Sequence, residues 1–194
     1  FKKLINEAYK GGGLKIGNDG EGYYISGEYW VIWIMEGWLP KKELASIIEL
    51  TGEMPEPGES FRATKAGNQY ELPWNEAYNT MGNALDCQEY MRITPLTLKY
   101  TTGQQARILQ NPDNKTIVLI NDKFTDMIDN TAVEYENGES APEGPMISGK
   151  MQGVFWRNDT MALHVYPRKD DRNIKLLGYL EDFDITGEKT EDEH

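Results

Sequence analysis

The apolar residues at the start of the chain recur with helical spacing. Within residues 1–10, Leu4, Ile5 and Ala8 lie on one face of a helix, and lysines occupy other positions. Three consecutive glycines, Gly11 to Gly13, follow and end the pattern, because glycine favours a turn over a continued helix. The pattern predicts a short amphipathic helix over residues 1–10.

Short apolar runs separated by turn residues come next, and they predict strands. The turns are Asn18-Asp19-Gly20, in which Asp-Gly is a strong hairpin signal, and Ser26-Gly27-Glu28. The third run, residues 29–35, is apolar at both odd and even positions, which predicts a strand that is covered on both sides. The predicted strands of this region are 14–16, 23–26 and 29–35.

Helical spacing returns over residues 40–51. Pro40 suits the start of a helix, apolar residues follow at intervals of three and four, and Gly52 fits the position after the last turn. A third helix near 122–130 is predicted from the capping residues Asn121 and Asp122 and an apolar face.

The remaining segments are predicted from similar patterns. A short helix is expected around residues 76–78, a Gly/Pro loop over 137–145, an apolar run at 174–180 and an acidic tail from Glu188. The other extended segments are 61–65, 69–72, 90–93, 96–100, 106–110, 116–120, 154–156 and 161–166.

These elements predict an α+β fold that is rich in antiparallel strands and has three short helices. A hairpin followed by a helix occurs near residues 23–51 and again near 106–129, which favours two similar half-domains. The predicted division is an N-terminal half (1–74), a C-terminal half (75–186) and an acidic tail (187–194).

Composition narrows the class of protein. The chain has 194 residues, 39% of them apolar, which suffices for a packed core, and its longest strongly apolar run, residues 29–35, is too short to cross a membrane. A net charge of −12 repels nucleic acid at long range, so DNA association is expected only through a local lysine patch. The single cysteine, Cys87, forms no internal disulfide and favours a cytoplasmic protein.

Catalytic motifs are missing from the sequence. His164 is predicted to be an ordinary strand histidine, and His194 is terminal, so no nucleophile has a partner base. Asp86 disfavours a thiolate at Cys87, and the His and Cys sets that zinc needs are absent. The sequence therefore predicts no metal site and no cofactor, and it favours a protein that is not an enzyme.

Clusters of acidic residues leave one enzymatic alternative open. A pair of carboxyl groups about 5 to 9.5 Å apart in a cleft would be typical of a glycoside hydrolase, with or without a divalent cation. In a chain this acidic, such clusters are typical of a solvated surface. They are Asp122, Asp126 and Asp129; Asp170 and Asp171; and Glu181, Asp182 and Asp184.

Aromatic residues are concentrated between positions 23 and 38, where they suit either a core or a stacking platform for sugars or bases. Trp38, between Gly37 and Pro40, is the one expected to be exposed and to bind a partner. The others are Tyr23, Tyr24, Tyr29, Trp30 and Trp33.

One segment resembles a known family. Gly144-Pro145-Met146-Ile147-Ser148, then Gly153 to Trp156, a turn, and Met161 to Arg168 is similar to the closing hairpin of a sliding-clamp domain. The resemblance implies a ring of repeated domains, no catalysis, and DNA passing along helices that carry lysines. The lysines that would serve are Lys2, Lys3, Lys10, Lys41 and Lys42. The acidic residues near 122–129 depart from this pattern.

The sequence thus favours a non-enzymatic binding or assembly module, clamp-like and DNA-associated, over a hydrolase with paired carboxylates. A protein partner or self-association is expected, and a membrane is not. An accessory protein of a phage or mobile element is a further interpretation of the sequence, which concerns its origin and not its mechanism.

Overall fold

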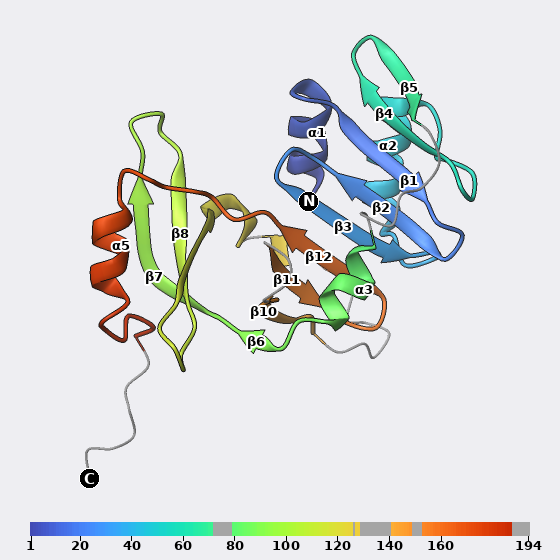
Figure 1. The fold of residues 1–194 in the computed structure, drawn as a ribbon. Helices are drawn as coiled ribbons and strands as arrows, with labels where there is room; N and C mark the ends of the chain where they lie inside the picture. Colours follow the sequence, from blue (N-terminus) through green and yellow to red (C-terminus); the bar gives the residue numbers. More distant parts are fainter. Residues whose placement is uncertain (72–78, 126, 129–140, 149–152, 188–194) are drawn as a thin grey trace.

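The computed structural model describes residues 1–71, 79–125, 127–128, 141–148 and 153–187, and these form two antiparallel sheets with short helices (Figure 1). The strands of the larger sheet are β1 (Leu14–Asn18), β2 (Gly22–Ser26), β3 (Trp30–Met35), β4 (Ser60–Thr64), β5 (Gly67–Glu71), β6 (Glu89–Tyr90), β10 (Glu143–Ile147), β11 (Val154–Arg157) and β12 (Met161–Val165). The smaller sheet holds β7 (Arg92–Lys99), β8 (Gln105–Gln110) and β9 (Ile117–Asn121). The helices are α1 (Lys2–Lys10), α2 (Lys41–Thr51), α3 (Thr80–Leu85) and α5 (Ile174–Leu180), with a 3-10 turn η2 (Asp122–Phe124).

The larger sheet has nine strands in the order β5-β4-β1-β2-β3-β12-β11-β10-β6, and the smaller has three in the order β7-β8-β9. All of their pairings are antiparallel. The predicted α+β fold, rich in antiparallel strands, is confirmed.

Polar side chains fix the predicted hairpin turns. Between β1 and β2, the Asp19 Oδ1 accepts from the backbone N–H of Gly22 at 2.8 Å, and the Asn18 Oδ1 accepts from Gly20 at 2.8 Å. Between β11 and β12, the Asn158 Oδ1 accepts from the N–H groups of Thr160 and Met161 at 3.0 and 2.9 Å. Asn and Asp satisfy backbone donors in this way wherever a strand must reverse within a few residues.

Strand β3 lies at the centre of the larger sheet and is buried on both sides, as its sequence predicts. Trp30, Ile32 and Ile34 belong to the main core, which also contains Leu4 and Ile5 of α1, Ile47 of α2, and Leu109 and Ile120 of the smaller sheet. Val31 and Trp33 point to the opposite face, where α3 packs against β3, β11 and β12. Two buried faces require apolar residues at every position, which is why the strand reads as one continuous apolar run.

Proline and glycine positions account for two departures from the predicted elements. The segments predicted at 90–93 and 96–100 are β6 and one long strand, β7, whose register with β8 shifts between Ile93 and Thr97; Pro95 lies at this shift and has no N–H for the ladder. The predicted Gly/Pro loop at 137–145 was too long at its end, because Glu143, Gly144 and Pro145 are the start of β10. Its irregular register with β11 between Glu143 and Met146 accommodates Gly144, whose φ is 131°.

The helices agree with the predictions in part. Helix α2 begins after Pro40 and ends at Gly52, whose φ of 83° is left-handed as a closing glycine requires. Of the helix predicted near 122–130, the described part consists of η2 and of Met127 and Ile128, which are helical. Residues 126, 129 and 130 lie outside the described residues, as do the helix predicted at 76–78 and the tail from Glu188. The apolar run at 174–180 is α5, which covers the outer side of the smaller sheet (Figure 1).

The larger sheet combines strands from residues 1–74 with strands from residues 75–186, and β3 and β12 form the pairing between them. The division into two half-domains stays a prediction. Among the described helices, none has the length and apolar character needed to span a membrane.

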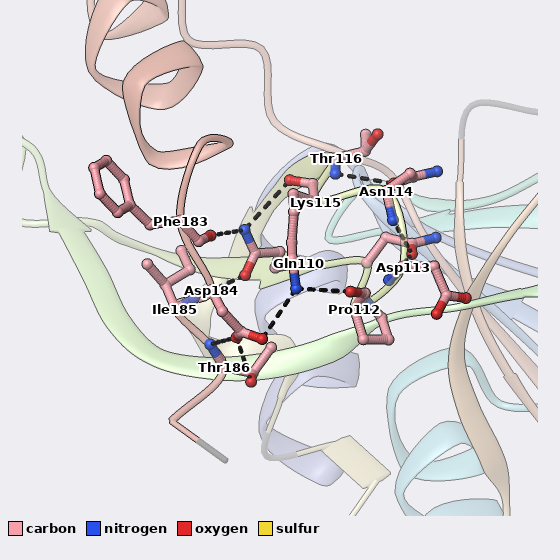
Figure 2. A network of polar contacts seen from close by, with 11 residues as sticks. Gln110, Pro112, Asp113, Asn114, Lys115, Thr116, Phe183, Asp184, Ile185 and Thr186 are labelled. Carbon is pink, nitrogen blue, oxygen red and sulfur yellow. Dashed lines mark hydrogen bonds and ion pairs between the residues drawn. The ribbon is translucent and has the colours of Figure 1, made fainter. Parts of the chain in front are cut away.

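The segment after α5, residues 181–187, lies against the β8–β9 turn, and we call it the C-terminal strap (Figure 2). The Gln110 Nε2 donates to the Phe183 carbonyl at 2.8 Å, and its Oε1 accepts from the Ile185 N–H at 2.9 Å. Gln110 is fully buried. Its side-chain amide donates to one backbone group of the strap and accepts from another, as a neighbouring strand would. The Lys115 ammonium binds the Asp184 carboxylate at 3.0 Å.

A methyl group at Gly17 is predicted to destabilise the fold. The Tyr24 ring lies over Gly17, and a Cβ there would overlap the ring. We expect Gly17→Ala to lower the free energy of unfolding by about 1–3 kcal/mol in urea denaturation. The control is Gly178→Ala in α5, where a Cβ meets nothing within 4 Å; it should stabilise by about 0.5–1 kcal/mol. Equal effects of the two substitutions would contradict this reading of Gly17.

Removal of the Gln110 amide should detach the strap. Gln110→Ala leaves the backbone groups of Phe183 and Ile185 without their buried partner, which typically costs about 1–3 kcal/mol. We expect that loss in equilibrium unfolding, together with faster hydrogen exchange at Ile185. Gln69→Ala, on the exposed edge strand β5, should change stability by less than about 0.5 kcal/mol. Unchanged exchange at Ile185 would show that other contacts hold the strap.

Acid should release the same strap. Hydrogen bonds from the Thr186 hydroxyl and N–H, and the Lys115 ammonium, lower the pKa of Asp184 to about 2. A lowered carboxyl pKa stabilises the folded state above the usual value of about 4, and this contribution is lost as the pH falls toward 2. NMR shifts of the Thr186 amide should therefore titrate in that range and stay constant in Asp184→Asn. A midpoint near pH 4 in the unaltered protein would contradict the hydrogen bonds from Thr186 and the contact with Lys115 that lower this pKa.

Candidate nucleic-acid interface

Helices α1 and α2 lie side by side on one face of the larger sheet. Each has an apolar side, with Leu4 and Ile5 of α1 and Ile47 of α2 buried in the core. The opposite side of each helix is exposed, as expected for helices that cover a sheet with one face; that of α1 is polar, whereas α2 exposes Ala45 and Ile48 beside its charged residues. The apolar spacing of these segments in the sequence therefore determines which of their side chains reach solvent.

The exposed sides of the two helices carry the lysines that the sequence singled out. All of them are exposed, and we call this set the lysine face: Lys2, Lys3, Lys10, Lys41 and Lys42. The helices contain only three acidic residues, Glu7, Glu43 and Glu49, so the lysine face is locally positive on a chain with a net charge of −12.

The starts of the two helices are close together. The pKa of the Phe1 amino group is lowered, first by burial; Glu43 raises it and Lys42 lowers it, so the first turn of α2 is beside the start of α1. The structure thus brings together Lys2 and Lys3 with Lys41 and Lys42 at one end of the helix pair, while Lys10 lies in the last turn of α1.

The position of these four lysines is electrostatically unfavourable in the free protein. The N-terminal end of a helix carries partial positive charge and its first N–H groups have no partners within the helix. Neither helix start has a side-chain cap; α1 has no acidic residue in its first turn, whereas α2 has one, Glu43, beside its two lysines. Cations there repel the helix dipole and one another, and a bound anion would relieve both repulsions.

Lys123 was not among the predicted site residues, and the fold brings it next to the lysine face. Its ammonium binds the Glu7 carboxylate of α1 at 2.9 Å. In the sequence, Lys123 lies among acidic residues, which disfavour a cationic site there. In the structure, the neighbouring Asp122 carboxylate is bound by the Arg107 guanidinium at 2.7 Å. The position of Lys123 next to α1 follows only from this contact between residues far apart in the sequence. Asp126 and Asp129, the other acidic residues near Lys123, lie outside the described residues.

The aromatic residues of positions 23–38 mainly form the core. Tyr24, Trp30 and Trp33 are buried, and Trp33 donates its indole N–H to Asp19 at 2.9 Å. Trp38 was expected to be exposed, but it is half-buried and packs against the main core. Tyr29 is the exposed member, with 53% of its surface accessible. A binding role for Trp38 stays a prediction.

Several of the acidic residues considered for hydrolysis have structural partners. The Asp170 carboxylate accepts from the Tyr100 hydroxyl at 2.6 Å and from the Asn173 amide at 2.7 Å. The Glu181 carboxylate accepts from the Ile117 N–H at 3.1 Å, and Asp184 binds Lys115. In the part of the chain that the structure describes, no three His, Cys, Asp or Glu side chains are placed to hold a metal ion together.

The residues weighed as a nucleophile or a base are buried. Cys87 packs in a small cluster with Phe155 and Ala162, and burial, then Asp86, raise the pKa of its thiol to about 11. His164 is a buried residue of β12 whose ring stacks on Phe155 with centroids 4.3 Å apart. A thiol with a raised pKa and a covered imidazole suit packing rather than nucleophilic chemistry.

A cleft of about 630 Å³ lies on the side of the larger sheet opposite α1 and α2, and no pattern in the sequence predicts it. Lys15, Arg62 and Lys169 line it together with Tyr29 and Tyr166. These residues are far apart in the sequence and come together through the pairing of β1 with β4 and of β3 with β12. The sequence around each of these residues does not predict a cleft, because each lies at a polar position that is usual for a strand, a turn or the end of a strand.

The likeness of this chain to known proteins is weak. No protein-family model matches the chain, and no curated protein matches it. Among solved structures, it is similar to the DNA polymerase III beta chain from Streptococcus pneumoniae, with 9% sequence identity and a TM-score of 0.30. The match covers 91% of this chain and 65% of that chain, so the chain spans less than two thirds of the length of that protein.

Proposed function

We propose that this protein is a non-enzymatic binding module that associates with DNA through its lysine face. The observation that carries the proposal is the placement of Lys2, Lys3, Lys41 and Lys42 in the first turns of two adjoining helices. Phosphate groups of a nucleic-acid backbone are the anions that such a site suits, because both the ammonium groups and the free N–H groups favour them.

The rest of the charge distribution limits this contact to one surface. With a net charge of −12, the protein as a whole repels a polyanion, so binding requires the lysine face to be turned toward the DNA. Such contacts go to phosphates and not to base edges, and they therefore carry no sequence information. The proposal is thus for DNA association without sequence preference and with strong salt dependence.

In its finer form, the proposal is a clamp-like module that assembles with further copies or with a protein partner. The sequence resemblance of residues 144–168 to a closing clamp hairpin supports it, and so do the apolar side chains that α5 exposes, Ile174, Leu176 and Tyr179. A cytoplasmic location accompanies the proposal, and the free cysteine, Cys87, fits a reducing compartment.

The lysines of the first turns of α1 and α2 should strengthen DNA binding but lower the stability of the free protein. In the variant with Lys2, Lys3, Lys41 and Lys42 all replaced by Gln, we expect binding to a short duplex at low salt to weaken at least tenfold. The slope of log K against log[salt] should shrink by about 0.9 for each phosphate that the variant no longer neutralises. The melting temperature of the free variant should rise at low salt, because repulsion at the helix starts is removed.

A control with the same net charge separates local from global electrostatics. It replaces four exposed basic residues outside the lysine face by Gln: Lys65, Lys99, Arg172 and Lys175. This control should retain most of the affinity and the salt slope. Equal losses in both variants, or a lysine-face variant that binds like the unaltered protein, would overturn the proposal. Light scattering with and without the duplex gives the mass of the bound species and tests assembly separately.

A further inference from the structure

The cleft on the other face of the larger sheet has a cationic end. Arg62 of β4, Lys15 of β1 and Ser26 of β2 are direct partners in the ladder, so their side chains point to the same face, and all three line the cleft. Like charges directly opposite each other on neighbouring strands repel. The chain thus places two cations side by side at this end of the cleft, although its net charge is −12.

Local contacts hold the Arg62 guanidinium at the cleft. Its Nε donates to the Gly12 carbonyl at 2.8 Å, and Gly13 lies so close to the side chain that a Cβ at Gly13 would meet Arg62 at 2.6 Å. The glycines of the turn after α1 thus allow this approach. An arginine fixed in this way beside Lys15 presents a preformed site for an anion.

The other end of the cleft is aromatic. The Tyr166 N–H donates to the Tyr29 carbonyl at 3.0 Å, so the two residues lie beside each other, with 40% and 53% of their surfaces exposed. The Tyr166 ring is supported from below by His164, with centroids 4.3 Å apart. Glu28 hydrogen-bonds to Tyr29 and so raises the pKa of that phenol, which places one carboxylate at this end. Lys169 also lines the cleft.

We propose that this cleft binds a nucleotide, with its phosphates at Arg62 and Lys15 and its base against Tyr166 and Tyr29. The volume of about 630 Å³ is within the range of sites for small molecules. Tyrosine rings stack on any base, and the Glu28 carboxylate accepts hydrogen bonds from an exocyclic amine but repels phosphate, which orients the ligand. A peptide added to the sheet is disfavoured, because the cleft lies over strands whose backbone groups are already paired.

This site is separate from the lysine face. It lies on the opposite side of the larger sheet, and none of its cations belongs to α1 or α2. Failure of DNA binding would therefore leave the proposal intact, and failure of nucleotide binding would leave the DNA proposal intact.

Isothermal titration with ADP, adenosine and pyrophosphate tests the proposal. We expect ADP to bind, and adenosine and pyrophosphate each to bind at least tenfold more weakly, because each lacks one of the two groups that the cleft recognises. If adenosine binds as tightly as ADP, the cationic end does not bind the phosphates. If pyrophosphate binds as tightly as ADP, the aromatic end does not bind the base. Either result, or no ADP binding at millimolar concentration, overturns the proposal.

Paired variants locate the bound ligand. Lys15→Gln and Tyr166→Leu should each weaken ADP binding about tenfold. The matched controls are Lys65→Gln and Tyr90→Leu, at exposed positions that do not line the cleft, and they should bind ADP like the unaltered protein. Circular dichroism spectra of the four variants serve to check that each is folded. If the controls lose as much affinity as the cleft variants, ADP binds elsewhere and the proposal is wrong.

Discussion

The pairing of β3 with β12 is the constraint on which the rest of the structure depends. It joins strands more than a hundred positions apart, with Ile34 opposite Met161 and Trp30 opposite Val165. A shift of one residue would turn Ile32 away from the core and bring Val31 and Trp33 into it, so the register is specified by burial on both faces. Helix α3 packs against both of these strands, and the aromatic end of the cleft, Tyr29 and Tyr166, lies where the two strands continue past the ladder.

Much of the local structure was predictable because its signals are local. The hairpins at Asn18 and Asn158 are closed by side chains that bond to backbone groups two or three residues ahead, and α2 ends at a glycine that its geometry requires. The apolar spacing of α1 and α2 correctly placed their lysines in solvent. The predictions that failed concern positions where partners from elsewhere decide, such as Glu143 at the start of β10 and Trp38 against the core.

The cleft shows why the rest could not be predicted. Lys15 and Arg62 become neighbours only through the β1–β4 ladder, and Lys169 joins them only because β12 lies beside β3. The same holds for Lys123, whose contact with Glu7 links a 3-10 turn to the first helix. Periodicity identifies which face of an element is exposed, but it does not identify the element that will lie next to that face.

A nine-stranded open sheet has two ends at which further strands could add, and this protein limits addition at both. At one end the edge strand is β6, which is only two residues long and offers few unpaired backbone groups. At the other end β5 reads Gly-Asn-Gln-Tyr-Glu, a polar sequence with poor strand propensity. The length and the composition of these two edge strands thus disfavour edge-to-edge aggregation of the larger sheet, while its core strands remain among the most apolar parts of the chain.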